Sequence, residues 1–177
     1  MHYEIKTGGS VVYEGRIIRL HLDDVMLEDH SRSKREYVEH PGGAAIVAET
    51  EKGIIFVEQF RYPVSRTLLE LPAGKLDKGE DPLSAARREF EEETGYFAKE
   101  LQLLGEMYPS PGYTDEVIYL YLATGLEMRQ AHRDEGEFLS VKYLPAEKAA
   151  EMIASGEIKD AKTVIALLKY LCFFRDR

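Results

Sequence analysis

The chain has 177 residues, of which 44% are hydrophobic and 31% charged, a composition typical of a globular protein. Its length predicts one compact unit, with room for a small appendage. The 23 basic and 32 acidic side chains give a net charge of −9, which argues against generic binding to nucleic acid or to an anionic membrane. A small anionic substrate would need local arginines or bridging cations.

The first residues and the single cysteine of the sequence lead us to expect a cytoplasmic protein. The start "MHYEIKTGG" has neither the basic segment nor the apolar core of a secretory signal, and no apolar run approaches the roughly 18 residues of a membrane span. The single cysteine, Cys172, lies in an apolar tail with helical spacing and cannot form an internal disulfide. We therefore expect a reducing compartment and a buried, structural thiol.

The first half of the chain reads as strands. Residues 11–38 alternate loosely around the turn-rich segment "EDHSRSK", which predicts two or three antiparallel strands before the break "HPGG". Residues 44–50 and 53–60 predict a buried hairpin, and residues 68–73 a short apolar strand after a loop.

A helix is predicted between Asp81 and Gly95. Asp81 can cap free amides, Pro82 suits the first helical position, and Gly95 is a typical stop. A core-facing stripe is expected at Leu83, Ala86 and Phe90.

The second half predicts further strands and two terminal helices. Strands are expected within 101–113, 116–126 and 139–144, a polar loop over 129–138, and helices over 145–156 and 161–174. Strands outnumber helices in mixed order, which predicts an α+β fold with helices packed on a mixed sheet. Residues 1–41 are too few to be stable alone. We expect them to form a small antiparallel β subdomain that pairs with a second copy, giving a homodimer with composite active sites, while residues 42–177 form the main domain.

The stretch "RREFEEETG", residues 87–95, clusters like charges that destabilise a helix. At 100° per residue, Glu89, Glu92 and Glu93 share one sector of the helix, whereas Glu91 points elsewhere. A hard divalent cation such as Mg²⁺ would turn this repulsion into coordination. A solvated acidic face, stabilised by the two preceding arginines, is an equally good interpretation of this motif alone.

The spacing upstream matches G-x5-E-x7-R-E-φ-x-E-E-x-G-φ, where φ is a hydrophobic residue. The positions are filled by Gly74, Glu80, Arg88, Glu89, Phe90, Glu92, Glu93, Gly95 and Tyr96. The chain resembles the Nudix hydrolases, which cleave a nucleoside diphosphate linked to another moiety. The resemblance implies an α/β/α sandwich with a mixed sheet, and ion pairing of Arg88 with Glu80 to brace the helix and loop.

A metal site is part of what the resemblance implies. Glu89 and Glu93 are similar to the principal ligands of Mg²⁺ or Mn²⁺, and Glu92 to an additional or water-mediated one. The carbonyl of Ala73, just before the first glycine, would add a hard ligand without adding charge.

Segments outside the box resemble one subfamily, the ADP-ribose pyrophosphatases. Pro111 lies 16 positions after Gly95 within "SPGYTDE", and "SKREYVEHPGGAAIV", "VEQFRYP" and "IKDAKTVIALLKYL" extend the likeness over nearly the whole chain. Taken alone, "SPG" favours an ordinary turn between strands.

The subfamily resemblance implies substrate contacts. They are Arg61 at the phosphates, the turn Ser110-Pro111-Gly112 on the ribose side, Glu116 at a sugar hydroxyl, and Arg35 and Glu36 across a dimer interface. An arginine fork pairs well with two phosphate oxygens, although any one of these arginines can also be simply exposed. Where relatives place aromatic side chains over adenine, this chain has Arg16 and Ile17, of which the guanidinium could stack on a purine.

The loop "HRDEGEF" contains an E-x-E pair. On its own it is typical of a solvated acidic loop. The resemblance implies that Glu135 is the general base and Glu137 an auxiliary metal ligand, with the two roles interchangeable. His132 beside them is more typical of polar surface.

The sequence thus predicts a metal-dependent hydrolase that converts ADP-ribose to AMP and ribose 5-phosphate. Alternatives are a Nudix hydrolase of another nucleoside diphosphate sugar such as GDP-mannose, or a catalytically silent domain that senses nucleotides. A purely structural interaction domain would leave the carboxylate cluster unexplained.

Overall fold

The computed structural model describes residues 2–129, 136 and 138–175. The chain divides into two compact units, and each is described by itself. One comprises Met1–Gly42 with Tyr108–Val117, and the other comprises Gly43–Met107 with Ile118–Arg177. The short segment 108–117 thus joins the N-terminal unit, although some 65 residues separate the two in sequence.

The first unit is a three-stranded antiparallel sheet in the order β1-β2-β3. Its strands are β1 (Ile5–Glu14), β2 (Arg19–Met26) and β3 (Arg32–Glu39). β1 begins six residues before the expected start at Val11, because the pairing with β2 continues through Gly8 and Gly9 and across an irregularity between Lys6 and Gly8. Glycines carry no side chain to show an alternating pattern, so this part of the strand was invisible in the sequence.

This sheet has almost no core. Among its described residues only Asp23, Val25 and Gly42 are buried, while Val11, Val12 and Tyr13 of β1 are about half exposed. Three strands with so little buried apolar surface gain little free energy from the hydrophobic effect within one chain.

The second unit is a seven-stranded mixed sheet with helices on both faces. Its strands are β4 (Gly43–Thr50), β5 (Gly53–Arg61), β6 (Arg66–Glu70), β7 (Ala73–Lys75), β8 (Tyr96–Met107), β9 (Ile118–Met128) and β10 (Leu139–Leu144). Its helices are the 3₁₀ turn η1 (Tyr62–Val64), α1 (Pro82–Thr94), α2 (Ala146–Ala154) and α3 (Ala161–Phe173). The expected hairpin, the strand near residue 70 and both terminal helices are confirmed.

The sheet runs β10-β5-β4-β9-β8, with β6 on β5 and β7 on β4. Only β4 and β9 are parallel, with Gly43 opposite Ile118 and Ala48 opposite Ala123. β7 pairs antiparallel with the first residues of β4, so that Ala73 lies opposite Ala45 and Gly74 opposite Ala44. This pairing places the first glycine of the box on the sheet itself.

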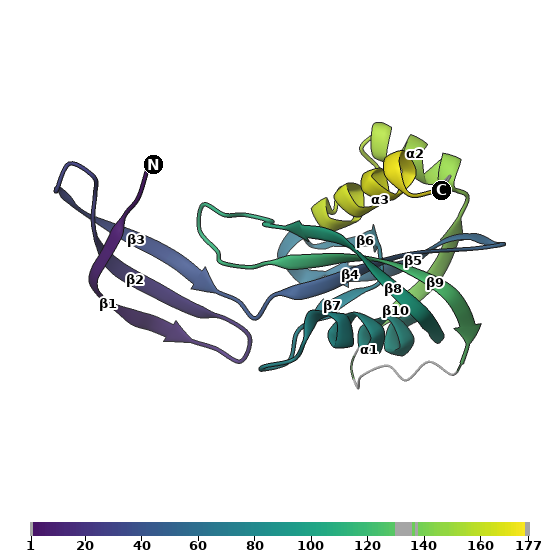
Figure 1. Ribbon diagram of the computed structural model, residues 1–177, viewed down its shortest axis with the longest axis horizontal. Helices are drawn as coiled ribbons and strands as arrows, with labels where there is room; N and C mark the ends of the chain where they lie inside the picture. Colours follow the sequence, from purple (N-terminus) through teal and green to yellow (C-terminus); the bar gives the residue numbers. More distant parts are fainter. Residues whose placement is uncertain (1, 130–135, 137, 176–177) are drawn as a thin grey trace. The chain divides into compact units, whose positions relative to one another are not determined.

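Two apolar clusters pack against the sheet of this unit. Figure 1 shows α2 and α3 on one side of this sheet and α1 on the other. Ala45 and Val47 of β4 belong to the cluster with α2 and α3, while Ala44 and Ile46 belong to the cluster with Phe90 of α1. The period of two along β4 therefore builds both layers at once. The α+β fold with a mixed sheet is confirmed.

Helix α1 has the predicted ends but not the whole predicted face. The Asp81 carboxylate accepts a hydrogen bond from the amide of Ser84 at 3.0 Å, and Gly95 has a φ of 74°, in the left-handed region. Leu83, expected in the core, is 39% exposed, and the buried positions are Ala85, Ala86, Phe90 and Glu93. Small alanines sit where the helix approaches the sheet, and the first turn extends beyond it.

The expectation for Cys172 was wrong, because its side chain is exposed on α3. The buried face of that helix is formed by Thr163, Ala166, Leu167 and Tyr170, so position 172 falls on the other side. Within the described residues, none of the helices is both long enough and apolar enough to cross a membrane.

Candidate active site

The carboxylate of Glu89 lies against Gly74. A methyl group added to Gly74 would stand 1.8 Å from the carboxyl carbon of Glu89 and 2.1 and 2.2 Å from its oxygens. The need for glycine here comes from this close approach, because no side chain can occupy that volume while Glu89 does. This single contact thus links Gly74 and Glu89 of the box.

Glu93 is buried, with 2% of its surface exposed, yet its carboxylate oxygen Oε2 accepts a hydrogen bond from the amide of Ala73 at 3.0 Å. The amide N–H of Ala73 therefore orients the Glu93 carboxylate beside the start of β7. A buried carboxylate in such a position is held by polar partners, as burial of a charge requires. Glu93 and the Ala73 peptide, 20 residues apart in the sequence, therefore lie next to each other.

Arg88 is the cation of the cluster. Its Nη1 lies 2.9 Å from Glu89 Oε1 and 3.0 Å from Glu92 Oε2, while its Nη2 lies 2.9 Å from Glu80 Oε2 and donates to the carbonyl of Lys75 at 3.2 Å. The predicted ion pair between Arg88 and Glu80 is confirmed. It lowers the pKa of the Glu80 carboxyl below its ordinary value, chiefly through the hydrogen bond from Arg88.

These donors fit a hard divalent cation in kind. Carboxylate oxygens and a peptide carbonyl are the ligands that Mg²⁺ prefers, and Gly74 leaves the space that a Cβ would fill. As the side chains stand, no group of three His, Cys, Asp or Glu residues in the described part of the chain is gathered closely enough to hold a metal. Arg88 pairs with both Glu89 and Glu92 in this arrangement, so a bound cation would share these carboxylates with Arg88 or replace it as their partner.

Arg61, expected at the substrate phosphates, forms a two-pronged ion pair with Glu70. Its Nε donates to Glu70 Oε1 at 2.7 Å and its Nη2 to Oε2 at 2.8 Å, while Lys162 also contacts Oε2. Burial raises the pKa of Glu70, but the hydrogen bonds and charges of Arg61 and Lys162 outweigh it and the net pKa is lowered. Sequence reasoning missed Glu70 and Lys162, although a lone glutamate within the apolar run "LLELPA" was a usable signal.

Within the first unit, the predicted segment 110–116 lies beside the end of β3. The carbonyl of Ser110 accepts hydrogen bonds from the amides of Tyr113 and Thr114 at 3.2 Å each, forming the expected turn with Pro111 and Gly112 exposed at its tip. The amide of Val38 donates to the carbonyl of Tyr113 at 2.8 Å.

Glu116 is half-buried next to His40, with 3.4 Å between its Oε1 and His40 Nδ1. The amide of Gly42 donates a hydrogen bond to the same Nδ1 at 3.1 Å. Glu116 therefore stands in a polar setting at the end of the predicted substrate segment.

The other predicted contacts of this unit are exposed. Arg35 on β3 donates through Nε to Glu4 Oε2 at 2.8 Å, and Glu36 follows it with its side chain in solvent. Arg16 is exposed in the turn between β1 and β2, which the amide of Gly15 closes by donating to the carbonyl of Ile18 at 2.9 Å. Glu135 and Glu137, the predicted base and auxiliary ligand, lie outside the described residues.

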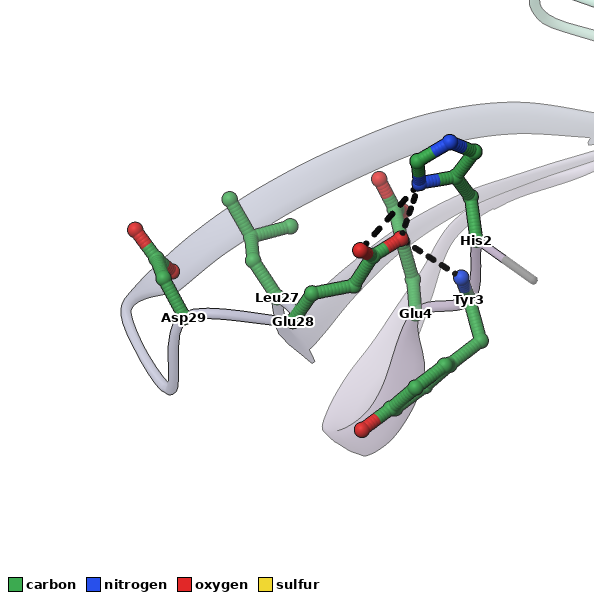
Figure 2. Close-up of a pocket in the computed structure, with 6 residues that line it drawn as sticks. All are labelled: His2, Tyr3, Glu4, Leu27, Glu28 and Asp29. Carbon is green, nitrogen blue, oxygen red and sulfur yellow. Dashed lines mark hydrogen bonds and ion pairs between the residues drawn. The ribbon is translucent and has the colours of Figure 1, made fainter.

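Two hollows in the described part of the chain are lined by none of the predicted site residues. One, of about 580 Å³, is lined by His2, Tyr3, Glu4, Leu27, Glu28 and Asp29 (Figure 2). There Glu28 is already held by His2 Nδ1 and by the amide of Tyr3, each at 2.9 Å. The other, of about 860 Å³, lies in the second unit between the β4–β5 turn, the later part of β9 and the end of α3. None of the glutamates of the carboxylate cluster lines either hollow.

Comparisons with known proteins agree with this geometry. The family model described as the NUDIX domain matches residues 39–167. The chain is 46% identical over 159 residues to the "ADP-ribose pyrophosphatase" of Bacillus subtilis (strain 168), covering 88% of this chain and 86% of that protein. It is 45% identical over the same length to the "Methanol dehydrogenase activator" of Bacillus methanolicus, with the same coverage.

A solved structure shares the fold. It is described as "Crystal structure of ADP compounds hydrolase", and it superposes with a TM-score of 0.87 at 20% identity, covering 99% of this chain and 96% of that one. The family match spans most of the chain and includes every residue of the box from Gly74 to Tyr96. The protein therefore belongs to the NUDIX domain family.

Proposed function

We propose that this protein hydrolyses the diphosphate of ADP-ribose to AMP and ribose 5-phosphate. The observation that carries the proposal is the close contact between Gly74, the first residue of the box, and the carboxylate of Glu89 on α1. The substrate is supported by the relative named for ADP-ribose hydrolysis at 46% identity. A likeness of that extent over 88% of the chain includes the segments outside the box that resemble the subfamily.

Mg²⁺ is the proposed cofactor, with Mn²⁺ as the alternative. The Ala73 carbonyl, Glu89 and Glu93 would hold it, with Glu92 and Glu137 as additional ligands. Such a cation screens the diphosphate, lowers the pKa of a bound water and stabilises charge on the leaving phosphate. Among the protein's own groups, the Ala73 amide keeps the Glu93 carboxylate oriented, and Arg88 offsets part of the negative charge of the cluster before substrate enters.

The proposed proton acceptor is Glu135, which would remove the proton of the attacking water, with Glu137 able to exchange roles with it. The proposed substrate contacts are Arg61 at the phosphates, Ser110, Pro111 and Gly112 on the ribose side, Glu116 at a sugar hydroxyl, and Arg16 at the adenine. Arg61 suits this role, because its two hydrogen bonds to Glu70 fix the plane of the guanidinium.

A homodimer is the proposed assembly. The described part of the N-terminal sheet buries only Val25 among its apolar side chains, so a second copy would supply the apolar contacts that one chain lacks. Arg35 and Glu36 on β3 would reach across that interface. We place the protein in the cytoplasm, on the sequence features given above.

The test is release of AMP from ADP-ribose by the purified protein, with and without Mg²⁺, alongside GDP-mannose and NADH. Fast, metal-dependent cleavage of ADP-ribose in preference to the other two is the expected result. Preference for GDP-mannose would keep the chemistry and overturn the substrate. No cleavage of any of the three, with ADP-ribose still bound, would leave the nucleotide-sensing alternative.

The relative named as a methanol dehydrogenase activator is nearly as similar as the first. Its name refers to a partner protein and states no reaction. An assay of the purified chain therefore separates hydrolysis by this protein alone from an effect that needs the partner. Hydrolysis of ADP-ribose without any added dehydrogenase is expected if the reaction is intrinsic to this fold.

A further inference from the structure

We propose that Lys162 is a positioning residue for the reaction, which acts through Glu70 to fix the guanidinium of Arg61. The inference rests on the proposed function in one respect, that Arg61 contacts the phosphates of the substrate. It adds a role for the start of α3, which none of the sequence motifs assigned.

Glu70 is the fixed point of this arrangement. Only 1% of its surface is exposed, and both of its carboxylate oxygens are engaged by Arg61 at 2.7 and 2.8 Å. Two parallel N–H···O bonds define the plane of a guanidinium as well as its position. Among the described residues, Nη1 of Arg61 makes no hydrogen bond, and 39% of the side chain is exposed, so one edge of the fork is available to a ligand.

Lys162 is the second cation that holds the Glu70 carboxylate. Its Nζ contacts Glu70 Oε2 and lies 3.0 Å from Asp160 Oδ1, and only 12% of its side chain is exposed. Two carboxylates and two cations therefore form a neutral set. Without Lys162, the buried Glu70 would lose one of its two positive partners, and the cost of an incompletely neutralised buried carboxylate would fall on the Arg61 bond.

The backbone that carries Lys162, in the first turn of α3, is rigid. Asp160 caps α3 by accepting from the amide of Thr163 at 3.0 Å, and the hydroxyl oxygen of the fully buried Thr163 accepts from the amide of Leu71 at 2.8 Å. Leu71 directly follows Glu70, so the first turn of α3 contacts the end of β6 at the glutamate and at the residue after it. A side chain held on two rigid elements can define position more precisely than one on a loop.

This arrangement is connected to the carboxylate cluster. The charge of Glu93 contributes to raising the pKa of Arg61, after the larger effects of the hydrogen bond that Arg61 donates to Glu70 and of the charges of Glu70 and Asp160, so Arg61 lies within electrostatic reach of Glu93. Three residues after Glu70, the amide of Ala73 binds Glu93 at 3.0 Å. One short segment of chain thus sets both the arginine and a candidate metal ligand, and a displacement of about 1 Å at such a place can lower a rate about 100-fold.

The experiment compares Lys162→Met with Lys162→Arg, using Lys148→Met on α2 as the matched control. Lys148 is exposed and pairs only with Glu151 at 3.4 Å, so its loss should leave activity unchanged. We expect Lys162→Met to raise KM for ADP-ribose about tenfold or more with a smaller effect on kcat, and Lys162→Arg to restore most of it. An analogue of ADP-ribose with a methylene bridge between the phosphorus atoms should lose affinity in parallel.

A double-variant comparison separates positioning from general stability. If Lys162 acts through Arg61, Lys162→Met should change KM little in an Arg61→Lys background, whereas a merely structural role would lower the melting temperature and leave KM unchanged in both backgrounds. An unchanged KM in Lys162→Met, or effects of the two substitutions that multiply, would overturn the proposal.

Failure of the proposed function is distinguishable from failure of this inference. If the wild-type protein cleaves another nucleoside diphosphate sugar instead of ADP-ribose, the same comparison on that substrate tests Lys162, because both substrates carry a diphosphate. A wild-type protein that binds neither the analogue nor any such substrate would overturn both.

Discussion

Replacing Gly74 by alanine should disable the site while leaving the fold intact. The added methyl would lie 1.8 Å from the carboxyl carbon of Glu89, and ordinary contact begins at 3.4 Å, so the carboxylate must move by roughly 1.6 Å, the difference of the two. Coordination of a hard cation tolerates only about 0.2 Å in ligand distance. Because Glu89 is a candidate principal ligand, we expect metal-dependent hydrolysis of ADP-ribose to fall about 100-fold.

Stability should change little, since the obstacle is the far end of a flexible side chain and not backbone. We expect the melting temperature of Gly74→Ala to stay within a few degrees of wild type, and half-saturation by Mg²⁺ to rise. Gly8→Ala is the control, because its new Cβ meets nothing closer than 3.5 Å and Gly8 lies in the exposed β1 strand. Wild-type turnover and Mg²⁺ dependence in Gly74→Ala would refute the reasoning that this contact seats a metal ligand.

Four further predictions concern chemistry, stability and assembly. Glu93→Gln should lower kcat at least 100-fold with the fold retained, while Glu91→Gln on another face of α1 should be near wild type in the same assay; an active Glu93→Gln enzyme would contradict the proposed metal role. Glu70 has a folded pKa below its ordinary 4.5, so its stabilising contribution is present above about pH 4.5 and is lost as the pH falls through the lower folded value. Urea unfolding between about pH 3 and 7 should show this loss in the wild type and a shallower dependence in Glu70→Gln. Thr163→Val should lower the free energy of unfolding by about 1–3 kcal/mol, because the buried amide of Leu71 loses its acceptor, and Thr163→Ser should restore most of it by the same measurement. Light scattering at micromolar concentration should give the mass of a dimer, and a monomer would refute the proposed pairing of the N-terminal sheets.

Local rules were enough for the helix and the box. The caps at Asp81 and Gly95 follow from short-range hydrogen bonding and backbone freedom, so both were predictable from neighbouring residues. The grouping of Glu89, Glu92 and Glu93 follows from helical geometry alone. Leu83 was misplaced, since periodicity defines which residues share a face but not how far along the helix the sheet extends.

The spacing of residues in the sequence could not predict the contacts between distant segments of the chain. The hydrogen bonds of Val38 with Tyr113 and with Asp115 place the segment 108–117 with the N-terminal sheet, and these residues are about 75 positions apart with no local signal of the pairing. Cys172 had an apolar neighbourhood in sequence, yet the side of α3 that is buried is decided by where that helix meets β4 and β9.

The sequence by itself determined the family of this protein, because the box places carboxylates, an arginine and a glycine at intervals set by one helix and one loop. Only the tertiary structure decided why Gly74 must be glycine, through its contact with Glu89, and which partners Arg61 has. Glu70 and Lys162 are 92 residues apart, and their ion pair exists because α3 packs with its first turn against the end of β6. Such pairings depend on how whole elements pack, a property of the folded chain that no local pattern of residues contains.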